Sequence, residues 1–339
     1  MRELIEVQKK LLPDLLSIMQ KRYEILRYIR LMQPIGRRAL SVNLGLSERV
    51  LRSEVDFLKS QNLLLVHSSG MTLTQEGTVL MQKLEEMMKE VFGLKHLEEK
   101  VKKTLHLPNV VVVAGDSDTS PWVKKEMGRA CVTCMRERFH AENIIGVAGG
   151  TTIAAVAEMM KPDAKNRELL FVPARGGLGE NVQNQANTIC ASMAEKALGS
   201  YRLLHIPDEL SNASYQTMIE EPSIKEVLSL IKKCSMVVHS IGDAKTMAER
   251  RKTDQAKVAT IEQKQAVAEA FGYYFNEQGE VVHKVKTVGM QLAELEKIET
   301  VIAVAGGASK AKAIRAYLKQ APNTILITDE GAAKELIRE

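Results

Sequence analysis

Two short stretches of this sequence nearly repeat each other: residues 144–152 are IIGVAGGTT, and residues 301–310 are VIAVAGGASK. Each begins with a strand-length apolar run that lacks polar alternation, which is typical of a strand buried on both faces of a parallel sheet. Each run continues into Ala-Gly-Gly, where the two glycines allow a tight turn and a close backbone approach. A helical pattern follows both turns. The two stretches therefore predict parallel strands that lead through glycine turns into helices.

The two glycine turns have the chemistry of an anion site. A helix that begins at such a turn points free backbone N–H groups at whatever occupies the turn. Thr151 and Thr152 add hydroxyl groups to the first turn, and Ser309 and Lys310 add a hydroxyl and a positive charge to the second. Together they predict a small molecule that carries phosphate at one or both ends. The alternative is two tight strand-to-helix turns without a ligand.

The rest of the chain from residue 109 onward alternates strand-like and helix-like segments, which predicts a doubly wound, Rossmann-like α/β domain. Ligands of such folds bind beyond the carboxyl ends of the strands, and glycine-containing polar turns follow several expected strands here. The buried strands are expected at residues 110–114, 144–148, 169–172, 201–206, 236–241, 281–285, 301–305 and 324–328.

Cationic residues follow two of these strands. Arg175 comes directly after the strand expected at 169–172, and its guanidinium offers bidentate geometry for a phosphate. Arg250 begins a basic cluster at residues 250–252, for which a solvated helix end is an equal alternative. A GxGxxG after the first strand and a GxxxxGK[ST] are both missing, so dinucleotide and nucleoside-triphosphate sites lack their motifs. No nucleophile triad or carboxylate pair is recognisable at short range.

Length and composition set the limits for these interpretations. A chain of 339 residues with 45% hydrophobic residues should form about two domains with real cores. No apolar run is long enough for a membrane span, and the start of the chain lacks a signal-peptide pattern, so a cytoplasmic location is expected. Cys131 and Cys134 form a CxxC without a second pair at metal spacing, which favours packing residues over a metal site. We therefore expect neither a metal nor a cofactor.

The net charge of +5 lies entirely in the first 60 residues. That segment has 12 Lys and Arg against 7 Asp and Glu, whereas the remaining residues have 35 of each sign. Such an asymmetry indicates an anionic polymer as the partner of the N-terminal part. The alternative is a solvated basic face.

A helix-turn-helix pattern lies in this basic segment. A helix is expected at 21–32 after an interruption at Pro13, and a short one at 37–44, followed by a turn at Gly45. The next helix, 48–60, has an apolar side and an outward side with arginine and serine, as in a DNA-recognition helix. A hairpin over 63–74 adds a wing. The residues expected to contact double-stranded operator DNA are Arg37, Arg38, Ser47, Arg49, Arg52 and Ser53. The alternative is a three-helix packing domain with solvated arginines.

A further helix is expected over residues 74–92. Its Leu80, Leu84, Met87 and Val91 have the 4-3-4 spacing of a coiled-coil seam, which favours a contact between subunits over packing within the domain. The charged stretch 95–103 would then link the two parts. We therefore expect a winged helix-turn-helix domain over residues 1–92 and an α/β effector and oligomerisation domain over residues 93–339.

In this order of domains and loops, the chain resembles the SorC-type bacterial sugar-binding transcription regulators over essentially its whole length. The most specific segments are residues 149–152, 175–177, 241–242, 305–310 and 326–330. The resemblance implies an effector domain related in fold to sugar-phosphate isomerases. It also implies a repressor of glycolytic genes that is controlled by fructose 1,6-bisphosphate and assembles as a homotetramer, two dimers on one operator.

The resemblance also implies roles for individual residues. Many family members have Gly-Asp where this chain has Ala268 and Glu269, a departure that bears on the sugar contacts. Phosphate would lie near Gly149, Gly150, Thr151, Thr152, Gly307 and Lys310, the other negative end near Arg175 and Arg250, and the sugar hydroxyls near Gln185 and Glu269.

The competing function is that of an enzyme, a sugar-phosphate isomerase or deaminase with an accessory N-terminal domain. Such an enzyme has no need of the first 92 residues, and it requires an acid/base pair that Glu269 or Asp116 would have to supply. A scaffold that binds neither DNA nor sugar is a third class, against which the glycine turns argue.

Overall fold

The structure is a computed structural model, and it describes residues 7, 10–165, 167–178 and 181–338. The chain falls into two units, Met1–His96 and Leu97–Glu339, whereas the sequence suggested a division after residue 92. None of the helices in the described ranges has both the length and the apolar character needed to cross a membrane.

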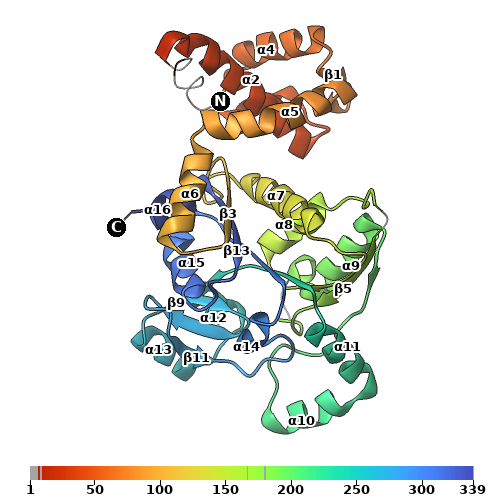
Figure 1. The fold of residues 1–339 in the computed structure, drawn as a ribbon, viewed down its shortest axis with the longest axis vertical. Helices are drawn as coiled ribbons and strands as arrows, with labels where there is room; N and C mark the ends of the chain where they lie inside the picture. The colour runs from red at the N-terminus through yellow and green to blue at the C-terminus, as the bar shows by residue number, and fades with distance from the viewer. Residues whose placement is uncertain (1–6, 8–9, 166, 179–180, 339) are drawn as a thin grey trace. The chain divides into compact units, whose positions relative to one another are not determined.

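The first unit contains the expected helix-turn-helix and wing (Figure 1). The interruption expected at Pro13 is confirmed: Leu12 is not helical, and Pro13 stands in the first turn of the helix that follows, where proline is tolerated because that N–H has no intrahelical partner. Gly45 adopts φ +63 at the end of the short helix, and Ser47 caps the recognition helix by accepting the Val50 N–H at 3.3 Å. The elements are α2 (Pro13–Met32), α3 (Arg37–Leu44), α4 (Glu48–Ser60), β1 (Leu64–His67), β2 (Gly70–Leu73) and α5 (Gln75–Val91).

Helix α5 buries a different side from the predicted seam. Its buried residues are Gly77, Met81, Met88 and Val91, whereas Leu80, Leu84 and Met87 are half-buried. Within its own unit, this helix therefore packs mainly through residues outside the predicted 4-3-4 seam. Of the seam residues, Val91 is the one that is buried. The charged stretch 95–103, expected to link the two parts, lies within helix α6 (Leu94–Thr104), and the boundary between the two units falls inside it.

The second unit is built on a seven-stranded parallel sheet in the order β3-β13-β12-β7-β4-β5-β6. The α/β fold predicted from the glycine turns is confirmed. Helices α7, α8 and α9 cover one face of the sheet, and α11 and α16 cover the other. The strands are β3 (Asn109–Val113), β4 (Glu142–Val147), β5 (Glu168–Pro173), β6 (Ser200–Tyr201), β7 (Met236–His239), β12 (Thr300–Val304) and β13 (Ile325–Asp329).

The helices of this unit pack on a core that includes Cys131 and Cys134. Both are free thiols, and burial raises their pKa, which confirms that they are packing residues. The helices are α7 (Val123–Glu137), α8 (Thr151–Met159), η1 (Val182–Asn184), α9 (Ala186–Ala197), α10 (Asn212–Glu220), α11 (Pro222–Lys232), α12 (Ala244–Arg250), α13 (Gln255–Gln263), α14 (Leu292–Leu295), η2 (Ala308–Lys310), α15 (Ala311–Leu318) and α16 (Glu330–Leu336).

A second, antiparallel sheet was not predicted. It contains β8 (Gly242–Asp243), β9 (Ala266–Ala270), β10 (Tyr273–Asn276) and β11 (Val281–Lys284), in the order β11-β10-β9-β8. The expectation of a buried parallel strand at 281–285 is wrong, because β11 pairs antiparallel with β10 and is partly exposed. Phe271 and Gly272 both have positive φ in the turn between β9 and β10, as a tight hairpin requires.

The order of the parallel strands reverses between β4 and β7. These strands are neighbours, but the chain continues from β4 to β5 on one side and from β7 to β12 on the other. In open α/β sheets, such a switch point leaves a crevice beyond the carboxyl ends of the strands, where ligands bind. The first glycine turn follows β4 at this point.

Replacing Gly128 by Ala should destabilise the second unit. The added Cβ would lie 2.5 Å from the Ala155 carbonyl oxygen, where α7 packs against α8. Overpacking costs about 1–3 kcal/mol, which outweighs the gain of about 1 kcal/mol that alanine gives a helix. Urea unfolding measures the change. Gly36→Ala is the control, because nothing lies within 4 Å of its added Cβ, and equal stability of the two variants would contradict the packing argument.

The stability of this unit should also fall in acid because of His239. Its Nδ1 faces the Ser240 carbonyl oxygen at 3.2 Å, so Nδ1 donates and Nε2 accepts the Tyr317 hydroxyl at 3.1 Å. Burial lowers the pKa of His239 to about 4, so the unfolded chain binds more protons than the folded chain between about pH 6.5 and 4.

Over that window the wild type should lose roughly 3 kcal/mol more of its free energy of unfolding than His239→Gln, since each pKa unit is worth about 1.4 kcal/mol. Denaturant titrations at pH 7 and pH 4 compare the two proteins. Parallel losses in both would show that His239 does not titrate in the folded chain.

Candidate functional site

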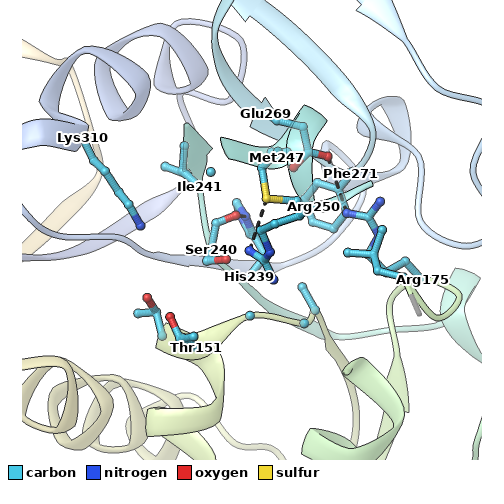
Figure 2. Close-up of a pocket in the computed structure, with 17 residues that line it drawn as sticks. Thr151, Arg175, His239, Ser240, Ile241, Met247, Arg250, Glu269, Phe271 and Lys310 are labelled. Carbon is cyan, nitrogen blue, oxygen red and sulfur yellow. Dashed lines mark hydrogen bonds and ion pairs between the residues drawn. The ribbon is translucent and has the colours of Figure 1, made fainter. Parts of the chain in front are cut away.

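A cavity lies at the switch point, beyond the carboxyl ends of β4 and β7 (Figure 2). The turn after β4 forms one wall, the segment after β7 forms the floor, and residues of η2, α12 and β9 form the opposite side. The lining residues are Ala148, Gly149, Gly150, Thr151, Thr152, Arg175, Leu178, His239, Ser240, Ile241, Gly242, Met247, Arg250, Glu269, Ala270, Phe271 and Lys310.

Most of the residues expected to contact the effector line this one cavity. Gln185 and Gly307 are not among the lining residues; Gln185 is the N-cap residue of α9. Asp116, the carboxylate offered for an enzyme, does not line the cavity either. The lining residues that were expected are Gly149, Gly150, Thr151, Thr152, Arg175, Arg250, Glu269 and Lys310.

The first glycine turn presents open backbone donors. Gly150 has φ +116, and its N–H donates to the Asn184 carbonyl oxygen at 2.8 Å. Helix α8 begins at Thr151 without a side-chain cap, so the Thr151 and Thr152 N–H groups have no acceptor among the described residues. Thr152 is 4% exposed, and its hydroxyl makes no hydrogen bond with a described residue. Donors without acceptors at the edge of a cavity fit an anion, which the helix N-terminus also favours.

The second glycine turn is already filled by carboxylates. The Gly307 N–H donates to Asp329 Oδ2 at 2.8 Å, and the Ser309 N–H donates to Asp118 Oδ2 at 2.8 Å. The Ala308 N–H lies 3.4 Å from Asp116 Oδ1. The expectation that both turns present free N–H groups is therefore not met here. Of the described residues of this turn, Lys310 is the one that lines the cavity.

Lys310 is a cation without a described partner. It is half-buried, and it makes no hydrogen bond or ion pair with any residue that the structure describes. Burial and the nearby charge of Lys124 lower its pKa, which Asp118 only partly offsets. Its ammonium group and the Thr151 side chain lie on facing sides of the cavity (Figure 2). An anion between them would relieve the cost of burying this charge.

The other side of the cavity rests on a ring of four buried charges. Arg175 donates to both Asp208 oxygens, at 2.7 and 2.6 Å, and lies 3.5 Å from Glu269 Oε1. Arg251 contacts Asp208 and donates to Glu269 Oε1 at 2.7 Å. Each of the four side chains is at most 9% exposed. Burial alone would raise the pKa of Asp208, but the two arginines outweigh it and lower that pKa.

The ring changes the expected role of Arg175. Asp208 already binds its Nε and Nη2 in bidentate geometry, so that pair is not available to a phosphate, and Nη1 lies 3.5 Å from Glu269 Oε1. Asp208 was not predicted from the sequence, and Arg251 was predicted only as part of a basic cluster. No spacing links these positions, because the partners lie 18 to 94 residues apart in the sequence.

The exposed side of the helix-turn-helix has unpaired cations. Arg37, Arg38, Arg49 and Arg52 are exposed, and none of them forms an ion pair with a described residue. In contrast, Arg22 pairs with Glu54 at 2.8 Å and stacks on the Phe57 ring. Ser53 is exposed on the same side of α4, opposite the buried Leu51, Val55 and Leu58. Free guanidinium groups on α3 and α4 fit contacts with DNA phosphates and bases.

Two family models cover nearly the whole chain. Residues 18–88 match the CggR N-terminal DNA binding domain, and residues 89–338 match the family described as "Putative sugar-binding domain". The central glycolytic genes regulator of Priestia megaterium is 67% identical over 100% of this chain and 99% of its own length. The regulator of the same name from Bacillus subtilis is 64% identical over 100% of both chains.

Solved structures give the same assignment. A SorC-family transcriptional regulator from Enterococcus faecalis is 48% identical with a TM-score of 0.69, over 72% of this chain and 100% of that one. The full-length sorbitol operon regulator SorC from Klebsiella pneumoniae has the same fold, with a TM-score of 0.68 at 16% identity over 96% and 99% of the two chains. The chain therefore belongs to the SorC-type family of sugar-binding transcriptional regulators, in the group of the central glycolytic genes regulators.

Proposed function

We propose that this chain represses glycolytic genes and that a phosphorylated sugar, fructose 1,6-bisphosphate, controls its binding to operator DNA. The observation that carries the proposal is the pairing, in one cavity, of an open helix N-terminus with the half-buried cation of Lys310, which has no partner among the described residues. The names of the regulators that are 67% and 64% identical to this chain support glycolytic genes as the target.

One phosphate would bind between the N-terminus of α8 and Lys310. A bisphosphate has up to about four negative charges above its second pKa values, which lie near 6. A helix N-terminus supplies only about half a positive charge, so the Lys310 ammonium and the Thr151 and Thr152 hydroxyls must supply much of the binding free energy. Fixed backbone N–H groups add direction to these contacts.

The second phosphate would be held by Arg250, with the sugar hydroxyls between the two phosphates. Arg250 lines the cavity on α12, and Glu269 lines it on β9. Arg175 would contribute hydrogen-bond donors rather than net charge, because Asp208 pairs with it. Gln185 would need to move to reach the sugar, since it is not a lining residue.

Operator DNA would be bound by α3, α4 and the β1–β2 wing. In helix-turn-helix proteins, the second helix enters the major groove and the first crosses the backbone, which would place Arg49, Arg52 and Ser53 at base edges and Arg37 and Arg38 at phosphates. Two half-sites call for a symmetric dimer. We propose a homotetramer, a dimer of dimers, as the form that binds a full operator.

Replacing Arg52 by Ala should weaken operator binding by about 1–3 kcal/mol if the guanidinium contacts a base. Base preference at one operator position should relax, because the lost contact is specific to that base. Fluorescence anisotropy at fixed salt measures both effects. Arg22→Ala is the matched control, since Arg22 is engaged with Glu54. Unchanged affinity and preference for both Arg49→Ala and Arg52→Ala would exclude α4 as the recognition helix.

Replacing Lys310 by Ala should weaken binding of fructose 1,6-bisphosphate roughly ten- to a hundredfold, as expected for the loss of one charge-assisted contact. Thr152→Val, which keeps the shape of the side chain, should weaken binding in the same direction. Isothermal titration calorimetry measures the affinities. Both variants should still bind operator, because Lys310 and Thr152 belong to the second unit.

Lys312→Ala is the control for this experiment. Lys312 lies two positions from Lys310, but its side chain is 77% exposed and pairs with Glu277 outside the cavity. Wild-type affinity in Lys310→Ala, or an equal loss in Lys312→Ala, would contradict the proposed phosphate site.

A further inference from the structure

The ring of four buried charges has two members that do not line the cavity. Arg175 and Glu269 are lining residues, whereas Asp208 and Arg251 lie behind them. Asp208 is 2% exposed and contacts both arginines, and the Arg251 side chain, also 2% exposed, contacts both carboxylates. Two positive and two negative groups alternate, so the ring as a whole is neutral. Any effect of Asp208 and Arg251 on a ligand must therefore act through Arg175 and Glu269.

Glu269 is left with one open oxygen. Its Oε1 accepts the Arg251 guanidinium at 2.7 Å and the Gly272 N–H at 2.6 Å, and Arg175 lies 3.5 Å from the same atom. Its Oε2 accepts no hydrogen bond from a residue that the structure describes. Because Glu269 lines the cavity, this oxygen is an acceptor available to a ligand.

An ionised carboxylate can only accept hydrogen bonds. It attracts hydroxyl donors and repels the oxygens of a phosphate. A buried carboxylate remains ionised and fixed in orientation only while cations and donors hold it. The cavity therefore differs in chemistry along its length: the part at Lys310 and α8 suits an anion, and the part beside Glu269 suits hydroxyl groups.

We propose that Arg251 and Asp208 are positioning residues that set the selectivity of the cavity for hydroxyl-bearing ligands. Arg251 fixes Glu269 so that Oε2 faces the ligand, and Asp208 fixes both arginines. Phosphate binding at Lys310 and the N-terminus of α8 does not depend on them. This inference rests on the proposed phosphosugar function and adds the determinant of its hydroxyl recognition.

The test compares two ligands with the same phosphates. Fructose 1,6-bisphosphate has ring hydroxyls, and 1,6-hexanediol bisphosphate has a six-carbon spacer without them. Calorimetry on the full chain measures both affinities for the wild type and for Arg251→Met. The ratio compared is the affinity for fructose 1,6-bisphosphate divided by the affinity for the hexanediol ligand. We expect the ratio to fall about tenfold or more in Arg251→Met, as for a lost hydrogen bond to a charged group, while the affinity for the hexanediol ligand changes less than about threefold. A merely structural role would weaken both ligands alike.

Two more variants keep the test decisive. Arg251→Lys keeps the charge but lacks the guanidinium fork that spans two carboxylates, so it should restore part of the ratio. The double variant Asp208→Asn/Arg251→Met removes one charge of each sign. It should lower the ratio even if the single Arg251→Met variant fails to fold.

Three results would overturn the proposal. An unchanged ratio in the variants would show that Arg251 does not position Glu269. An equal loss of affinity for both ligands would show that the ring only stabilises the structure and does not select hydroxyl groups. A wild-type ratio near one would mean that this end does not recognise hydroxyls, although the phosphate site would stand. Failure of the wild type to bind either ligand would instead contradict the phosphosugar function itself.

Discussion

The second unit depends on one constraint, which is the ring of four buried charges. The ring consists of Arg175, Asp208, Arg251 and Glu269. Two of its members come from loops that follow the parallel sheet, and two come from the antiparallel part of the unit. Removing one member would leave an uncompensated buried charge, which is among the costliest changes a protein can undergo. The ring thus fixes the position of one sheet against the other, and the cavity between them keeps its shape because these four groups stay paired.

Local patterns predicted much of the fold. The glycine turns, the apolar runs before them and the cap at Ser47 all depend on residues a few positions apart, so the parallel strands and the helix-turn-helix could be found from the sequence. The antiparallel sheet could not. Residues 281–284 form β11 only because β10 and β9 lie beside them, and a short apolar run does not reveal whether its neighbour will be parallel or antiparallel.

The site could be predicted only in part, for the same physical reason. Thr152, Lys310 and Glu269 were found because strand ends or a family resemblance marked them. The groups that decide how these residues act were not found. Asp208 and Arg251 pair with partners in other loops, and Asp118 reaches the second glycine turn from 191 residues away. Such pairings depend on the three-dimensional arrangement, which periodicity and spacing do not encode.

The two near-identical turns have a consequence for the direction of binding. Had both been vacant, a molecule with similar groups at its two ends could have entered the cavity in either of two orientations. Asp118 and Asp329 act as built-in anions that occupy the second turn from within the chain. Only the first turn remains as a binding site for an external anion. The two turns of the repeat are therefore not equivalent. A ligand with similar groups at both ends would bind in one defined orientation.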